Sequence, residues 1–129
     1  MSNYAIKKKV EYSFEETIKK AEKELKKEGF GVLTEIDLKE TFKNKLDEDF
    51  KKYKIMGACN PNFAFEGFQS EDDLGLLLPC NFIVYENDLE ETIVAAIDPV
   101  KLLSFSEKEE INQLGKKIKK RFEKVIDRL

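Results

Sequence analysis

Two cysteines are the residues of this chain whose type and surroundings are best suited to chemistry. Cys59 is followed by Asn60 and Pro61, a pair typical of the cap and the first turn of a helix. Unpaired N–H groups at a helix start carry partial positive charge and favour an anion. A thiol there can have a lowered pKa, and the thiolate is its reactive form. The sequence therefore predicts a reactive or ligand-binding thiol at Cys59.

The second cysteine, Cys80, lies between Pro79 and Asn81 in an apolar segment. Pro79 cannot donate to a strand ladder, so it marks an edge, a bulge or a strand entry. The backbone near Cys80 is then partly free to face a ligand. An amide in an apolar strand needs partners, so Asn81 is expected either to hold a neighbouring loop or to face a ligand.

Whether the two thiols meet depends on topology. If the strand before Cys59 and the strand after Cys80 are antiparallel, both thiols lie toward one edge of the sheet; if they are parallel, the thiols lie at opposite ends. The opposing interpretation is that both cysteines pack as small hydrophobic residues. If the thiols do form a site, its expected ligand-binding residues are Cys59, Asn60, Cys80, Asn81 and Phe65.

Phe65 enters because the predicted helix over 62–69 also carries Phe63 and Phe68, too many aromatic residues for one helix face. At least one of them is expected at a pocket or a subunit interface. The alternative is that all three fill the core.

The absence of histidine narrows the chemistry. It excludes Ser-His-Asp and Cys-His catalysis and histidine-ligated zinc, and we predict no catalytic residue. A soft divalent metal such as zinc at Cys59 and Cys80 would need further ligands: carboxylates, backbone groups or thiols of a second chain. Carboxylates Glu35, Asp37 and Asp98 lie at element ends without the context of a hydrolase site.

Composition bounds the class of protein. The chain has 129 residues, of which 41% are hydrophobic and 38% charged, and its net charge is −3. One domain over residues 1–129 is expected at this length. Net acidity argues against a nucleic-acid partner, and the basic end of the last helix is explained by its dipole. The longest apolar run, 74–85, is too short and too interrupted for a membrane span. With no signal-peptide pattern, we expect a cytoplasmic protein whose cysteines stay reduced.

Alternating and helical patterns place the elements. Strands are expected at 3–12, 30–36, 53–59, 76–86 and 91–97, with the leucines at 76–78 deeply buried. Capping boxes begin helices at Ser13, Asp37 and Ser106, and Gly29 ends the first of them. Apolar residues recur along one face of the final helix, from Ile111 to Leu129.

This order, with a hairpin at 76–97, predicts an α+β fold: one mainly antiparallel sheet with helices packed on one face. The alternative is a mixed, doubly wound sheet.

Four stretches resemble a known family, domain of unknown function 302 (DUF302). They are residues 28–37 (Glu-Gly-Phe-Gly-Val-Leu-Thr-Glu-Ile-Asp), 57–61 (Gly-Ala-Cys-Asn-Pro), 75–86 (Gly-Leu-Leu-Leu-Pro-Cys-Asn-Phe-Ile-Val-Tyr-Glu) and 97–99 (Ile-Asp-Pro). The resemblance implies a fold similar to the TATA-box-binding-protein-like architecture and a homodimer, but no DNA binding and no known activity. Members often carry histidine or another polar residue near the position of Phe65, so this chain departs there from the pattern on which a shared metal or acid–base role would rest.

The sequence leads to three hypotheses for the function. The leading hypothesis is a small dimeric binding module whose pocket, lined by Cys59 and Cys80, takes a small ligand, a soft metal or a redox partner. The second is a structural or interaction protein with packed, inert cysteines and a dimer contact through the Phe-rich helix. The third, a thiol-dependent enzyme, is the weakest because no histidine activates the thiol.

Overall fold

One antiparallel sheet organises the protein. The computed structural model describes residues 2–129, and its strands are β1 (Ala5–Val10), β2 (Gly31–Asp37), β3 (Tyr53–Cys59), β4 (Cys80–Glu86) and β5 (Thr92–Ile97). They lie in the order β1-β5-β4-β3-β2, and every neighbouring pair is antiparallel. The predicted α+β class is confirmed and the doubly wound alternative is wrong. The resemblance to the TATA-box-binding-protein-like architecture stays a prediction.

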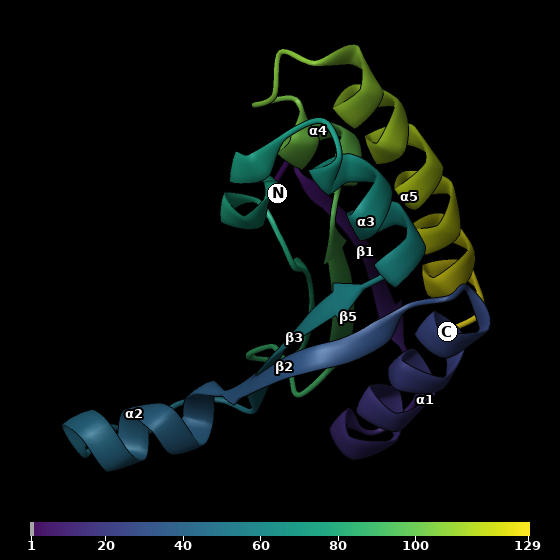
Figure 1. The fold of residues 1–129 in the computed structure, drawn as a ribbon. Helices are drawn as coiled ribbons and strands as arrows, with labels where there is room; N and C mark the ends of the chain where they lie inside the picture. The colour runs from purple at the N-terminus through teal and green to yellow at the C-terminus, as the bar shows by residue number, and fades with distance from the viewer. Residues whose placement is uncertain (1) are drawn as a thin grey trace.

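The helices are α1 (Phe14–Lys27), α2 (Leu38–Leu46), α3 (Pro61–Phe68), α4 (Pro99–Leu103) and α5 (Glu109–Asp127), with a 3₁₀ turn, η1 (Asp72–Leu76), before β4. Figure 1 shows α1 and α5 side by side on one face of the sheet. It also shows α2 projecting beyond the sheet from the connection between β2 and β3. Most of the opposite sheet face is left open.

The core lies between the sheet and the pair α1 and α5. Successive side chains of a strand point to opposite faces, so Phe82 and Val84 point to the helices and are fully buried. Phe122 of α5 meets Phe82 edge-on, with ring centroids 4.8 Å apart. The apolar stripe predicted for the last helix is confirmed, since its residues from Ile111 onward are buried.

Most of the predicted helix ends are present. Ser13 Oγ accepts from the Glu16 N–H at 3.1 Å, and Asp37 Oδ1 accepts from the Glu40 N–H at 3.0 Å. Gly29 follows α1 in the left-handed region, with φ of 86°. The capping box at Ser106 is wrong: α5 begins three residues later, and the Ser106 hydroxyl instead accepts from the Lys108 N–H.

The segment before β4 departs from the prediction of a buried strand over 76–79. Leu76 belongs to η1 and is 85% exposed, and β4 begins only at Cys80. Pro79 has no N–H to donate to the ladder, so strand pairing starts after it.

Helix α4 is an element that the sequence analysis does not predict. Asp98 caps it by accepting from the Val100 N–H, where the sequence indicated only the end of a strand.

None of the helices within residues 2–129 combines the length and the hydropathy that a membrane span requires.

Gly57 of β3 is a position where no side chain fits. A Cβ there would lie 2.2 Å from Thr34 Oγ1 and 2.6 Å from Pro79 Cγ, whereas a Cβ at Gly31 would meet nothing within 4 Å. We expect Gly57→Ala to lower the free energy of unfolding by roughly 1–3 kcal/mol, the usual cost of overpacking. Gly31→Ala should change it by no more than about 0.5 kcal/mol. Urea unfolding of both variants measures this, and equal stabilities would contradict the close packing at Gly57.

Candidate functional site

The antiparallel pairing of β3 and β4 brings the two cysteines to one edge of the sheet. Ala58 lies opposite Cys80, so Cys59 is one residue beyond that pair. Both cysteines are free. The condition set by the sequence, antiparallel strands, is met.

The thiols line a small apolar cavity. Its volume is about 20 Å³, enough for about one water molecule. The other residues around it include Phe30, Phe63 and Leu114. As the structure stands, the cavity has no room for an organic ligand.

Burial sets the acidity of both thiols. It raises the pKa of Cys59, and it raises the pKa of Cys80 to about 12, with a further contribution from the neighbouring Cys59. The lowered pKa expected for Cys59 at a helix start is therefore wrong. The cause is desolvation of the thiolate by the surrounding apolar side chains.

Of the other predicted site residues, Asn60 also lines the thiol cavity, whereas Asn81 and Phe65 do not. Asn60 caps α3: its Oδ1 accepts from the N–H groups of Asn62 and Phe63 at 3.0 and 3.2 Å. Asn81 is exposed on the opposite face of the sheet from Cys80. Phe65 is 71% exposed and lines neither the thiol cavity nor the groove described below.

No metal centre forms among the described residues. Within residues 2–129, no three His, Cys, Asp or Glu side chains gather to hold an ion. A metal at Cys59 and Cys80 would thus need backbone groups or a second chain for its further ligands. Asp98 pairs with Lys119 at 3.0 Å, and Glu35 lies 3.9 Å from Lys54, so these carboxylates have structural partners.

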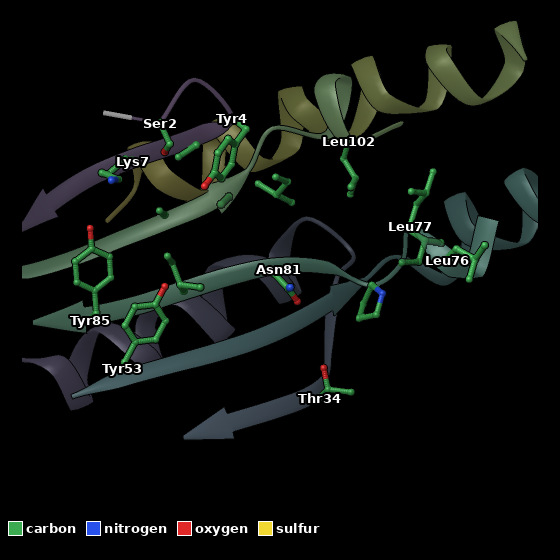
Figure 2. Close-up of a pocket in the computed structure, with 17 residues that line it drawn as sticks. Ser2, Tyr4, Lys7, Thr34, Tyr53, Leu76, Leu77, Asn81, Tyr85 and Leu102 are labelled. Carbon is green, nitrogen blue, oxygen red and sulfur yellow. The ribbon is translucent and has the colours of Figure 1, made fainter. Parts of the chain in front are cut away.

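A much larger hollow lies on the open face of the sheet. This groove, about 700 Å³ in volume, runs over β3, β4 and β5 between the N-terminal segment and the segment after η1 (Figure 2). Its lining residues are Ser2, Tyr4, Ala5, Lys7, Thr34, Tyr53, Leu76, Leu77, Leu78, Pro79, Asn81, Ile83, Tyr85, Ala95, Ala96, Ile97 and Leu102. A volume of this size suits a small organic molecule.

Two stacked tyrosines lie at one end of the groove, and Tyr4 lies between them and Leu102 (Figure 2). Tyr53 and Tyr85 are paired across β3 and β4, and their rings stack with centroids 5.2 Å apart and an interplanar angle of 9°. Burial raises the pKa of Tyr53, and the nearby phenols of Tyr85 and Tyr4 raise it further. Figure 2 shows the leucines, Leu76, Leu77 and Leu102, at the other end. The groove is thus polar at one end and apolar at the other.

Sequence reasoning missed the groove. Its signal was present in the alternation of Ile83 and Tyr85 with the buried Phe82 and Val84 of β4. Two apolar faces on one strand indicate either a core on both sides or an uncovered surface. Only the placement of the helices distinguishes the two.

The chain is similar to known proteins of one family. The model of the family "Domain of unknown function DUF302" matches residues 6–129. The chain is also similar to a solved structure, the crystal structure of an uncharacterized conserved protein DUF302 from Bacillus stearothermophilus. The identity is 28%, 98% of each chain is covered and the TM-score is 0.90. A search of curated proteins found no match.

The raised pKa of Cys80 makes stability depend on alkaline pH. In the unfolded chain the thiol ionises near its ordinary value of 9.0, and in the folded protein near 12. Its contribution is therefore complete below about pH 9 and is lost as pH rises toward about 12. At neutral pH we expect Cys80→Ala to lower the free energy of unfolding by about 1 kcal/mol. This difference from wild type should shrink at strongly alkaline pH.

Urea unfolding at neutral and alkaline pH measures that difference, with Cys59→Ala as the matched control. In the native protein at neutral pH, a disulfide reagent should label Cys80 only after unfolding. Fast labelling of native Cys80, or a stability difference independent of pH, would contradict the burial argument.

Proposed function

The chain belongs to the DUF302 family, and we propose that it is a binding module that holds a small organic molecule in the groove on the open face of its sheet. The observation that carries this proposal is the groove itself: about 700 Å³, with stacked tyrosines at one end and leucines at the other. Ligand sites are typically concave and mostly apolar, with a few convergent polar groups.

The floor of the groove supplies apolar contact area. It consists of the open-face residues of the central strands, where Ile83 lies opposite both Ile55 and Ala95. A ligand that covers this surface gains binding free energy of roughly 25 cal/mol per Å² of apolar area removed from water. The polar side chains on its rim, Thr34, Asn81 and Tyr4, can orient a ligand.

The groove suits ligand binding better than the thiol cavity does. The thiol cavity is about 20 Å³ and its thiols are protonated at neutral pH because burial raises their pKa. Uptake of a soft metal or a redox partner at Cys59 and Cys80 therefore needs a rearrangement of α3 or a second chain. We keep the thiol site as the less favoured alternative.

Binding in the groove is tested by NMR with a set of small aromatic and aliphatic fragments. Ligands should shift the side-chain signals of Ile83, Tyr53 and Tyr85. The variant Asn81→Trp should fill the groove and lower fragment affinity at least tenfold, because the exposed Asn81 lines it. Asn62→Trp places the same side chain on the exposed surface of α3 and should leave binding unchanged. Fragments that shift only signals elsewhere would refute the proposal.

The second candidate function is that of an interaction module. It is favoured by apolar side chains that are exposed on α3 and η1. Phe65 and Phe68 of α3 are 71% and 39% exposed, and Leu76 of the adjoining η1 is 85% exposed. Phe68 packs close to Gly75, so α3 and η1 form one apolar patch. Patches of this kind mark protein contacts. The partner we propose is a second copy of the chain, giving a homodimer.

Self-association through this patch is tested by light scattering after size exclusion. Phe65→Asp should convert the dimer to a monomer, because it places a charge at the centre of an apolar contact. Phe105→Asp is the matched control, since Phe105 is 80% exposed and lies outside α3 and η1. A monomeric wild type, or a dimer that Phe65→Asp leaves intact, would count against this contact.

A further inference from the structure

The charge of the groove differs in sign from that of the whole chain. Of the seventeen described residues that line the groove, Lys7 is the one cation and none is acidic. The chain as a whole carries 26 acidic residues and a net charge of −3. Lys7 is exposed and forms no ion pair within residues 2–129. Its ammonium is therefore available to an anion in the groove.

A second ammonium stands beside the stacked tyrosines. Lys51 Nζ lies 5.5 Å from the ring centroid of Tyr85 and 5.8 Å from that of Phe50. Cation–π contacts of this length hold an ammonium near a ring face. In Figure 2 the hydroxyl of Tyr85 points toward the strand that carries Lys7, and Tyr4 lies between Lys7 and Leu102. Phenol hydroxyls and ammonium groups are all donors to an anionic oxygen.

The other end of the groove offers only apolar contact. It is formed by Leu76, Leu77, Leu78, Pro79 and Leu102. Lys7 lies level with Ile83, because both pair with Ala95, and Pro79 is four residues from Ile83 along the chain, roughly 13 Å at the rise of a strand. The two ends are thus separated by the length of an extended hydrocarbon chain rather than by that of a single ring.

Resting on the function proposed above, we propose that the ligand is a carboxylate amphiphile of medium chain length. Its carboxylate lies at the tyrosine end, where it accepts hydrogen bonds from Lys7 and the tyrosine hydroxyls. Its hydrocarbon chain lies over Ile83 and Ile97 toward the leucines. Charge complementarity selects the head group, and the leucine end selects an apolar tail.

Three probes with one tail and different heads test the head group: decanoate, 1-decanol and decylammonium, each below its micelle concentration. The chain has no tryptophan, and three of its four tyrosines line the groove, so tyrosine fluorescence reports on this site. Calorimetry gives the dissociation constants. Decanoate should bind about tenfold more tightly than decanol, equivalent to about 1.4 kcal/mol, and decylammonium should bind more weakly than either.

Variants test which end of the groove binds the head group and which end binds the tail. Lys7→Gln should weaken decanoate about tenfold and leave decanol unchanged, while Lys7→Glu should reverse the preference toward decylammonium. Lys116→Gln, an exposed lysine of α5 on the covered side of the sheet, should change neither. Leu76→Gln should weaken decanoate and decanol alike. Since Lys7 and Leu76 are exposed, these variants should fold as the wild type does, which thermal unfolding checks.

The outcomes separate this inference from the function on which it rests. If fragments occupy the groove but the three probes bind equally, or not at all, the ligand class is wrong and the binding function stands. The same conclusion follows if Lys7→Gln has no effect on decanoate. If neither fragments nor probes shift the groove signals, both proposals fail.

Discussion

The contact between Phe122 and the sheet is the interaction on which the rest of this structure depends. Its ring meets Phe82 of β4 edge-on at 4.8 Å and lies 5.0 Å from Phe30, and all three side chains are at most 3% exposed. Aromatic pairs in this geometry contribute more than their buried area alone. The contact holds α5 against one sheet face. Because strand side chains alternate, Ile83 and Tyr85 must then lie on the other face. Alternate residues of the same strands thus form the core on one sheet face and the floor of the groove on the other.

Residues outside the sheet give the open face its depth. The segment 76–79 and the N-terminal residues form the walls of the groove, while the strands form its floor. Pro79 packs over Gly57 so closely that no side chain fits there. This close approach brings the leucines to one end of the groove. Tyr53 and Tyr85 lie at the other end because their register pairs them directly across β3 and β4.

The cysteines show how burial decides reactivity. Cys59 does lie directly before a helix, as its neighbours Asn60 and Pro61 indicate, but α3 has only eight residues and the thiol is partly buried among apolar side chains. Burial removes the thiolate from water and disfavours the charged form, so the pKa rises. In this setting Cys80 behaves as a small hydrophobic residue. The features that attracted attention in the sequence are therefore explained mainly by packing.

Local patterns determined much of this fold. Ser13 and Asp37 cap their helices because side-chain oxygens next to a helix start accept from its free N–H groups, whatever the rest of the chain does. The apolar stripes of α1 and α5 likewise identify the covered sheet face. Leu76 was misassigned because an apolar run has the same composition whether it is buried or exposed. Only the tertiary structure decided which sheet face stays uncovered, that the thiols share a cavity too small for an organic ligand, and that Lys7 and the tyrosines line one groove. These are relations between segments far apart in the chain, and side-chain periodicity carries no information about them.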